Sequence, residues 1–342
     1  MNYKGIVVTW LFKTDLTNMN AGEGSSNLKE IKTYSNGLPY ISGQSMRHAL
    51  RQSMKRENPD DFKCTPEFPC GNIQDCWTCD LFGYLLPSDG AKRWSPIKAS
   101  PALGQIRTQI TTDLIFRMVE DIKCPKCGKK MYPLSGRDED TKNISRGTEL
   151  TCIHCNEKFP APYDIRQALA YKQLSENTYR TSISIDTDNI GVEKVPKINT
   201  DNDSIVMDGT EDIVNIDCDE RLKRVKAILN AIYNLSDFAN QSREMTNATP
   251  DVVIISLQKQ YNHRLSSALN LNEKGNVDTK HLNSVLEDCI AMKDTNIFAG
   301  YLSGVVNNED ELNDVFNSLN DNNNFKFCKN PKITFDEAIN AL

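Results

Sequence analysis

Two pairs of closely spaced cysteines constrain the fold of this chain more than any other feature. Cys124 and Cys127 form one C-x2-C pair, and Cys152 and Cys155 form a second pair after 24 intervening residues. Four thiolates on two tight turns can complete a tetrahedral zinc shell that leaves no coordination position open. The surrounding segment, 123–160, is polar and has no core of its own, so metal binding would supply much of its folding free energy. The spacing therefore predicts a small insert that contains a structural Zn²⁺ ion.

Two alternatives to this four-cysteine site remain open, and a second group of cysteines raises the same question. His154 lies within the second pair and could replace a cysteine as ligand, or the four thiols could be free in a loop. The second group ends in another C-x2-C pair, but its first two gaps of five residues are irregular. It is a candidate second zinc site; alternatively, its last two cysteines pack beside Trp77 and other apolar residues. The group consists of Cys64, Cys70, Cys76 and Cys79.

The composition is that of a soluble globular protein. The chain has 342 residues, of which 39% are hydrophobic and 25% are charged. It contains no run of roughly 20 apolar residues such as a membrane span needs. The apolar stretch 6–12 lacks the cleavage site of a signal peptide, so we expect a cytoplasmic protein that does not contact a membrane. Without export, the 11 cysteines favour metal ligands and buried thiols over disulfides.

Charge is distributed unevenly along the chain. The formal net charge is −6, yet residues 1–118 contain 14 basic and 11 acidic residues. The segment 201–220 has eight acids and no Lys or Arg, and the segment 305–324 has five acids and no base. Because phosphate is bound by local patches, the acidic total does not exclude a nucleic-acid partner.

Hydrophobic periodicity predicts a mixed α+β order of elements. Strand, helix, a long decorated middle, helix and strand together fit a ferredoxin-like or RRM-like sheet with insertions. The segment 57–104 is rich in loop residues, 199–220 predicts a loose loop or hairpin, and 320–324 has the composition of a linker. Strands are predicted at 5–12, 114–119, 181–185 and 251–257, and helices at 44–56, 220–238, 279–292, 309–319 and 334–342.

The helix predicted at 44–56 is the most informative segment. Apolar residues at helical spacing form one stripe, while Arg47, Arg51 and Lys55 form a cationic stripe at intervals of four. A helix N-terminus offers free N–H groups that suit a phosphate, and guanidinium groups suit phosphate oxygens. Such a surface would follow a sugar-phosphate backbone without reading bases. The alternative is a solvated cationic face on an ordinary amphipathic helix. Neutral donors at the start of the helix are Ser42, Gln44 and Ser45.

The segment 38–51, LPYISGQSMRHALR, resembles the signature helix of the Cascade backbone proteins, which belong to the RAMP superfamily of CRISPR proteins. Other segments resemble the same family and follow in its order. The similarity spans residues 3–260, and the most similar branch is type I-B. The segment 18–27 is similar to the polar loop of the DevR branch, 79–83 to the motif after the first helix, 95–100 with 110–112 to the entry of the thumb, and 239–251 to the loop before the last core strand.

This resemblance implies a fold and a function. The fold is a modified RRM palm with finger and thumb insertions, in which 1–104 and 179–342 form the palm and 105–178 is the thumb-region insertion with the zinc knuckles. Copies would stack along a CRISPR RNA among other Cascade subunits, kink it, and leave guide bases free to pair with target DNA. The RNA-contacting residues that it implies are Ser42, Gln44, Arg47 and Arg51, followed by Lys98 and Arg107 at the thumb entry and Arg243 before the last strand.

Two other functions were weighed against this one. Related type III backbone subunits cut RNA with a loop aspartate, for which Asp15 or Asp113 could be proposed here. The four histidines are scattered and form no convincing acid–base pair, so we expect no enzymatic activity. A zinc-ribbon transcription regulator should have a helix that reads bases, whereas the basic helix here has the apolar face of a core helix. The sequence does not decide between antiviral defence and guided transposition.

Overall fold

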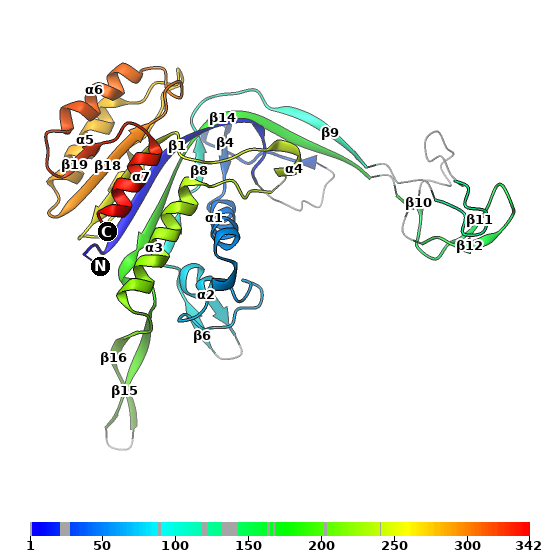
Figure 1. Ribbon diagram of the computed structural model, residues 1–342, viewed down its shortest axis with the longest axis horizontal. Helices are drawn as coiled ribbons and strands as arrows, with labels where there is room; N and C mark the ends of the chain where they lie inside the picture. Colours follow the sequence, from blue (N-terminus) through cyan, green and yellow to red (C-terminus); the bar gives the residue numbers. More distant parts are fainter. Residues whose placement is uncertain are drawn as a thin grey trace. The chain divides into compact units, whose positions relative to one another are not determined.

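The computed structural model describes residues 2–20, 28–87, 90–117, 122–130, 143–162, 165–166, 168–201, 204–239 and 241–342. The chain divides into two compact units (Figure 1). The first unit contains residues 1–21, 31–109 and 175–342, and the second contains residues 22–30 and 110–174. No helix in the described ranges is long and apolar enough to cross a membrane.

The first unit is built on a sheet in which β1 (Gly5–Thr17) is an inner strand. This strand pairs antiparallel with β14 (Ala168–Asp186) on one side and with β17 (Val252–Gln258) on the other. Its apolar run is buried on both faces, which explains why it lacks polar alternation. The strand order is β19 (Phe325–Phe327), β18 (Thr295–Tyr301), β17, β1, β14, β8 (Ala102–Gly104), β4 (Leu38–Ile41) and β3 (Thr33–Tyr34), and β7 (Ile97–Ala99) also pairs with β14.

Helices cover both faces of this sheet. One face packs Trp10 and Val8 against α1 (Gly43–Glu57), α3 (Cys218–Tyr233) and α7 (Pro331–Asn340). The other face packs Val7 and Leu11 with α5 (Thr279–Ala291) and α6 (Glu309–Leu319). The remaining elements of the unit are α2 (Trp77–Phe82), α4 (Gln241–Glu244), the hairpin of β5 (Tyr84–Leu86) and β6 (Ala91–Arg93), the hairpin of β15 (Val192–Asp201) and β16 (Ser204–Val214), and short 3-10 turns at Ser35–Gly37, Pro59–Asp61, Thr187–Asn189 and Arg264–Ser267.

The connections within the sheet follow a simple order. Along the chain come β1, α1, β8, β14, α3 and β17, while in the sheet the four strands lie in the order β17, β1, β14, β8. All three neighbouring pairs are antiparallel. The two connecting helices, α1 and α3, contribute to the same hydrophobic cluster, so they lie on the same face of the sheet.

The second unit contains short strands and one small core. β9 (Thr111–Arg117) pairs antiparallel with residues 168–174 of β14, and β2 (Leu28–Lys29) pairs parallel with residues 171–172. Two further pairs are β10 (Asn143–Ile144) with β13 (Ile165–Arg166), and β11 (Glu149–Thr151) with β12 (Lys158–Pro160). The core comprises Ile122, Cys124, Leu150, Cys152 and Ala161.

The predicted mixed α+β class is confirmed, with several differences in detail. The segment 57–104, predicted to be rich in loops, contains α2 and short strands that were not predicted. The strand predicted at 181–185 is the end of a strand of 19 residues. Of the loose loop or hairpin predicted at 199–220, the hairpin is confirmed, but its first strand, β15, already begins at Val192. The helix predicted at 220–238 ends earlier, at Tyr233, and β18 was not predicted.

Candidate nucleic-acid interface and cysteine clusters

The N-terminus of α1 is held by side chains from its own cap and from the loop after β1. The Ser42 hydroxyl accepts a hydrogen bond from the N–H of Ser45 at 3.2 Å. The N–H of Ser42 donates to Oδ1 of Asn20 at 2.9 Å, and the Ser45 hydroxyl donates to the carbonyl of Met19 at 2.7 Å. Ser42 and Ser45, predicted as RNA donors, therefore already have partners that fix the start of the helix.

The first turn of α1 lies unusually close to the neighbouring strand. A Cβ atom at Gly43 would lie only 2.8 Å from the carbonyl oxygen of Ala99, so a larger residue would displace the helix. Helical geometry leaves the N–H groups of Gly43 and Gln44 without acceptors inside the helix, and the side chain of Gln44 is exposed. The turn therefore offers main-chain donors to an anion.

Arg47 and Arg51 lie one turn apart, and both guanidinium groups contact Phe82. Nη2 of Arg47 donates to the carbonyl oxygen of Phe82 at 2.8 Å. The guanidinium carbons of Arg47 and Arg51 lie 6.0 and 5.9 Å from the centre of the Phe82 ring, at the distance of a cation–π contact. Nη2 of Arg51 also lies 3.0 Å from Nδ1 of His48. We call the two arginines and Phe82 the arginine cradle.

The charge of the cradle is not neutralised by a salt bridge. Within the described part of the chain, neither arginine has a carboxylate oxygen within ion-pair distance, and Nε of Arg47 is buried with no hydrogen-bond partner. Burial, and then the charge of Arg51, lower the pKa of Arg47. Burial also lowers the pKa of Arg51, and the carboxylate of Glu67, which lies near it without forming an ion pair, partly opposes this shift. Arginine nevertheless stays protonated at neutral pH. Two positive charges are thus placed beside each other on a half-buried surface that favours an anion.

The other predicted cations occupy different places on the first unit. Lys98, on β7, donates to the Tyr261 hydroxyl at 2.8 Å, and its Nζ lies 3.8 Å from Oδ2 of Asp186. Arg107 lies 3.9 Å from a carboxylate oxygen of Glu273, and because both side chains are exposed this pair contributes little stability. The backbone of Arg243 lies in α4, but its side chain lies outside the described residues.

The structure adds one cation that the sequence did not single out. Arg180 on β14 is half-buried and donates from Nη1 to Oδ1 of Asn270. Burial lowers its pKa, and the Tyr34 hydroxyl acts in the opposite direction. In the sequence Arg180 is an isolated basic residue in a stretch rich in β-branched residues. Only the alternation of side chains between the two faces of a strand could have predicted that it points away from the apolar core.

The two aspartates considered as alternatives for catalysis, Asp15 and Asp113, are both exposed. Asp15 lies at the exposed end of β1 in the first unit, and Asp113 is exposed on β9 in the second unit. Neither shows a described interaction with a histidine or with a cysteine cluster. No arrangement of the described residues therefore assigns either carboxylate a role in cleavage.

The four cysteines of the second unit come together as their spacing predicts. All four Sγ atoms lie within 4.8 Å of one another, and the Cys124–Cys155 and Cys127–Cys152 separations are both 3.7 Å. With Zn–S bonds of about 2.3 Å, a tetrahedral shell places its sulfur atoms about 3.8 Å apart. Nε2 of His154 lies 3.2 Å from the carbonyl of Lys130 and is not part of the group.

The two C-x2-C turns of this cluster have the same local conformation. In each, the N–H of the residue after the second cysteine donates to the carbonyl of the first cysteine at 2.9 Å, from Gly128 to Cys124 and from Asn156 to Cys152. Both of these residues have a positive φ, 68° and 57°, which glycine and asparagine adopt most readily. The two C-x2-C segments therefore form the same type of turn, which directs the cysteine side chains of both segments toward one point. The cluster could hold a metal ion there.

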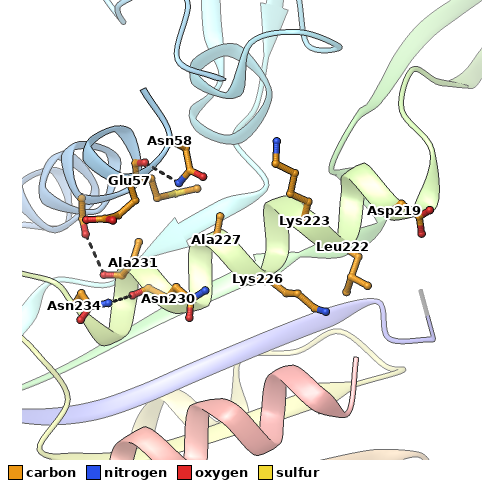
Figure 2. Close-up of a pocket in the computed structure, with 12 residues that line it drawn as sticks. Glu57, Asn58, Asp219, Leu222, Lys223, Lys226, Ala227, Asn230, Ala231 and Asn234 are labelled. Atoms are coloured by element: carbon orange, nitrogen blue, oxygen red, sulfur yellow. Dashed lines mark hydrogen bonds between the residues drawn. The ribbon is translucent and has the colours of Figure 1, made fainter. Parts of the chain in front are cut away.

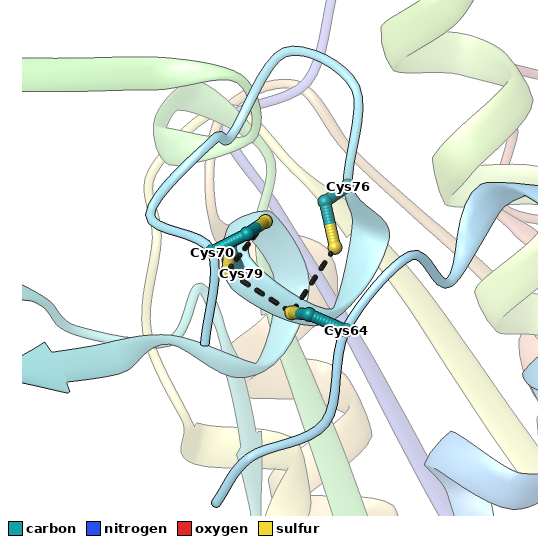
Figure 3. A group of neighbouring side chains, drawn as sticks. All are labelled: Cys64, Cys70, Cys76 and Cys79. Atoms are coloured by element: carbon teal, nitrogen blue, oxygen red, sulfur yellow. Dashed lines mark hydrogen bonds between the residues drawn. The ribbon is translucent and has the colours of Figure 1, made fainter. Parts of the chain in front are cut away.

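The second group of cysteines also converges, around the start of α2 (Figure 3). Sγ of Cys64 lies 3.4 Å from Sγ of Cys76 and 3.5 Å from Sγ of Cys79, and Sγ of Cys70 lies 3.7 Å from Sγ of Cys79. A hydrogen bond from the Cys79 thiol lowers the pKa of Cys76 to about 3 and raises that of Cys79 itself. This group, too, could hold a metal ion.

A groove of about 620 Å³ lies between the C-terminal part of α1 and α3 (Figure 2). Its polar side chains mostly complete the helices: Nδ2 of Asn58 donates to the carbonyl of Met54 and Nδ2 of Asn234 to that of Asn230. Its lining contains no histidine or cysteine. The lining of the groove does not include Arg47, Arg51 or Phe82.

Comparisons with known proteins agree with this architecture. A chain of a solved CRISPR RNA-guided surveillance complex is similar over 98% of this chain and 99% of that chain, with a TM-score of 0.54 and 14% identity. The chain has the fold of a CRISPR surveillance-complex chain. A chain of such a complex in a pre-nicking state shows the same coverage and TM-score at 12% identity. Residues 163–264 match the family described as CRISPR-associated negative auto-regulator DevR/Csa2. No curated protein matches the sequence.

Proposed function

We propose that the chain is the CRISPR RNA-binding backbone subunit of a type I Cascade complex, of the type I-B branch. One observation carries this proposal: a surveillance-complex fold presents Arg47 and Arg51 one turn apart on α1, with no salt bridge to any described residue. Their guanidinium groups, together with the main-chain donors of Gly43 and Gln44, suit consecutive phosphates of a single strand.

The chemistry of this surface favours the RNA backbone over its bases. The groups around the cradle are cationic or main-chain donors, and such contacts position a nucleic acid without reading its sequence. Sequence specificity would then come from pairing between the guide and target DNA, as in other RNA-guided complexes. Lys98, Arg107 and Arg243 would extend the RNA contact beyond α1. Copies of this chain would form a filament along the RNA and associate with other Cascade subunits. The complex would act in the cytoplasm.

We assign the parts of the fold accordingly. The strand order β17, β1, β14, β8, with α1 and α3 on one face, matches the β-α-β-β-α-β connection of ferredoxin-like and RRM-like sheets, which supports a palm formed by 1–104 and 179–342. The insertion 105–178 would be the thumb, which kinks the RNA, with a zinc-ribbon-like knuckle pair formed by Cys124, Cys127, Cys152 and Cys155. In this assignment the zinc is structural and the subunit is not an enzyme.

The decisive experiment is recovery of RNA with the full chain. The protein should be expressed with its neighbouring genes and a CRISPR array, purified, and treated with nuclease before RNA extraction. We expect guide-derived fragments of uniform length, because stacked subunits would protect a fixed stretch of RNA. Purified protein that carries no RNA and binds duplex DNA more tightly than single-stranded RNA would contradict the proposal and favour a DNA-binding regulator.

A further inference from the structure

We infer that Cys64, Cys70, Cys76 and Cys79 bind one Zn²⁺ ion whose purpose is to hold Phe82 against Arg47 and Arg51, so that RNA binding depends on this metal. The inference rests on the proposed function for its second half. Its first half, the metal site, stands independently of what the chain binds.

The geometry of the four sulfur atoms fits a zinc shell. The three Sγ separations of 3.4, 3.5 and 3.7 Å are close to the roughly 3.8 Å expected from Zn–S bonds of about 2.3 Å. They are far longer than a disulfide bond of about 2.05 Å, and all four cysteines are free. Four thiolates leave no position for a substrate, so the ion would be structural.

The loop before α2 has little apolar core of its own, whereas α2 packs into the main core through Trp77, Leu81 and Phe82. Residues 63–75 contain no helix or strand, and α2 has only six residues, fewer than a helix needs to be stable on its own. The buried apolar residue beside the sulfur atoms is Ile73, with Tyr84 partly buried against it. A zinc ion would join the loop cysteines Cys64 and Cys70 to Cys76 and Cys79 of α2 (Figure 3).

The path from the cluster to the cradle is short. Cys76 is the N-cap of α2, Cys79 lies in its middle, and Phe82 is its last residue. The carbonyl of Phe82 accepts the hydrogen bond from Arg47, and its ring underlies both guanidinium groups. Loss of the metal would free the start of α2 and with it the surface that orients both arginines.

A second anchor of α2 makes the inference falsifiable. Asp80 is fully buried and pairs with Arg93 and Arg224, and Trp77 and Leu81 are buried in the main core, so these contacts could hold α2 without metal. If that anchor were sufficient, removing the cysteine ligands would leave the cradle intact. The inference requires instead that the arginines lose their orientation when the metal is lost.

The test compares two matched double variants of the full chain. Cys64→Ser with Cys70→Ser removes two accessible ligands of this cluster without altering the buried cysteines of α2, and Cys127→Ser with Cys155→Ser does the same in the other cluster. Metal analysis should find one zinc ion for each cluster in the wild type, and one fewer in each variant. Affinity for single-stranded RNA should fall about 10- to 100-fold in the first variant, equivalent to one or two charge-assisted hydrogen bonds. It should be unchanged in Cys218→Ser, at an exposed thiol outside both clusters.

Each outcome decides a different part of the inference. Wild-type protein with no zinc dependent on Cys64 and Cys70 overturns the metal site. Loss of zinc with unchanged RNA affinity would overturn the proposed dependence of RNA binding on the metal. It would mean that the contacts of Asp80 are sufficient to hold Phe82 against the two arginines. A third variant, Phe82→Ala, should keep its zinc and still lose RNA affinity, which excludes general misfolding as the cause. If Arg47→Ala with Arg51→Ala leaves RNA affinity unchanged, the proposed function fails, while the zinc measurement still tests the site.

Discussion

Nη1 of Arg224 donates to Oδ2 of Asp80 at 2.5 Å, across 144 positions of the sequence, and both side chains are almost completely removed from solvent. The other carboxylate oxygen, Oδ1, accepts hydrogen bonds from Arg93 and from the N–H of Gly191. One buried acid therefore joins α2, the β5–β6 hairpin, the start of β15 and α3. A buried charge that loses its partner is costly because neither water nor another group replaces it.

Asp80→Ala should lower the free energy of unfolding by about 3–5 kcal/mol, because Arg93 loses its carboxylate partner and the buried Arg224 keeps only Glu220. Chemical denaturation measures this loss directly. The control is Lys223→Ala, next to Arg224 on α3, whose ion pair with Asp61 is partly exposed. That variant should change stability by at most about 1 kcal/mol. Equal losses in the two variants would contradict the central role of Asp80.

Replacing Arg47 and Arg51 together by alanine should weaken binding of single-stranded RNA irrespective of its sequence. The slope of log affinity against log salt should become shallower by about 1.4, since each lost phosphate contact contributes about 0.7. Titrations at several salt concentrations measure this slope.

The matched control for the arginine pair is Lys55→Ala with Arg56→Ala, which removes the same charge from the last turn of the same helix. Arg56 already pairs with Asp237 at 2.7 Å, so this control should leave the salt slope nearly unchanged. Equal changes in both double variants would mean that RNA responds to the net charge of α1 and not to the cradle.

Local patterns in the sequence predicted the parts of the fold that depend on near neighbours. The apolar stripe of the helix at 44–56 is buried as expected, at Met46, Ala49, Leu50 and Met54. The paired C-x2-C turns likewise bring their cysteines together. In the helix, the spacing of the apolar residues determines which side chains face the core. In each C-x2-C turn, the spacing places the two cysteines close enough to share one metal ion.

Features that depend on distant contacts were not predictable in this way. β18 was not predicted, and it contains a glycine, Gly300, a residue that is uncommon in strands. A Cβ atom at Gly300 would lie 2.2 Å from Oγ1 of Thr334, so the close packing of α7 on this strand requires glycine. α2 is too short to show a helical period. The sequence also marks the segment 79–83 only by resemblance, whereas the partners of Asp80 and Phe82 come from elements far along the chain.

Gly83→Ala should destabilise the protein more than Gly90→Ala. Both glycines have a positive φ, 74° and 63°, which disfavours alanine at each, and the ψ of 172° at Gly83 lies in a region that essentially only glycine adopts. Only at Gly83 would the new Cβ meet the main chain, 2.5 Å from the carbonyl oxygen of Arg93. The difference between the two unfolding free energies measures this clash together with the backbone strain specific to Gly83, and equal values would show that the end of α2 can relax.

Asp251→Asn should stabilise the protein at neutral pH. Burial raises the pKa of Asp251 above its ordinary value of 3.8, and the N–H of Lys13, which donates to Oδ2 at 2.8 Å, only partly opposes this. Because the folded pKa is higher than the unfolded one, the ionised carboxylate costs stability as pH rises above 3.8. An amide avoids that cost and still offers an acceptor to Lys13.

Denaturation of the wild type and of Asp251→Asn across the range from about pH 4 to 7 tests this prediction. The stabilisation should be greatest at neutral pH and should shrink as the pH approaches 3.8. Asp188→Asn, at an exposed position, should show no such trend. A constant difference at every pH would mean that the effect of the amide is unrelated to ionisation.

Cys127→Ser should release the metal ion from the second unit and leave the first unit folded. The reason lies in the separation of the cores: the cluster packs on Ile122, Leu150 and Ala161, while the sheet has its own two hydrophobic clusters. Limited proteolysis should therefore open new cleavage sites within 122–162, with an unchanged unfolding midpoint for the sheet. Cys218→Ser, at an exposed thiol outside both clusters, should change neither result. Cooperative unfolding of the whole chain in the Cys127 variant would instead make the metal part of the main core.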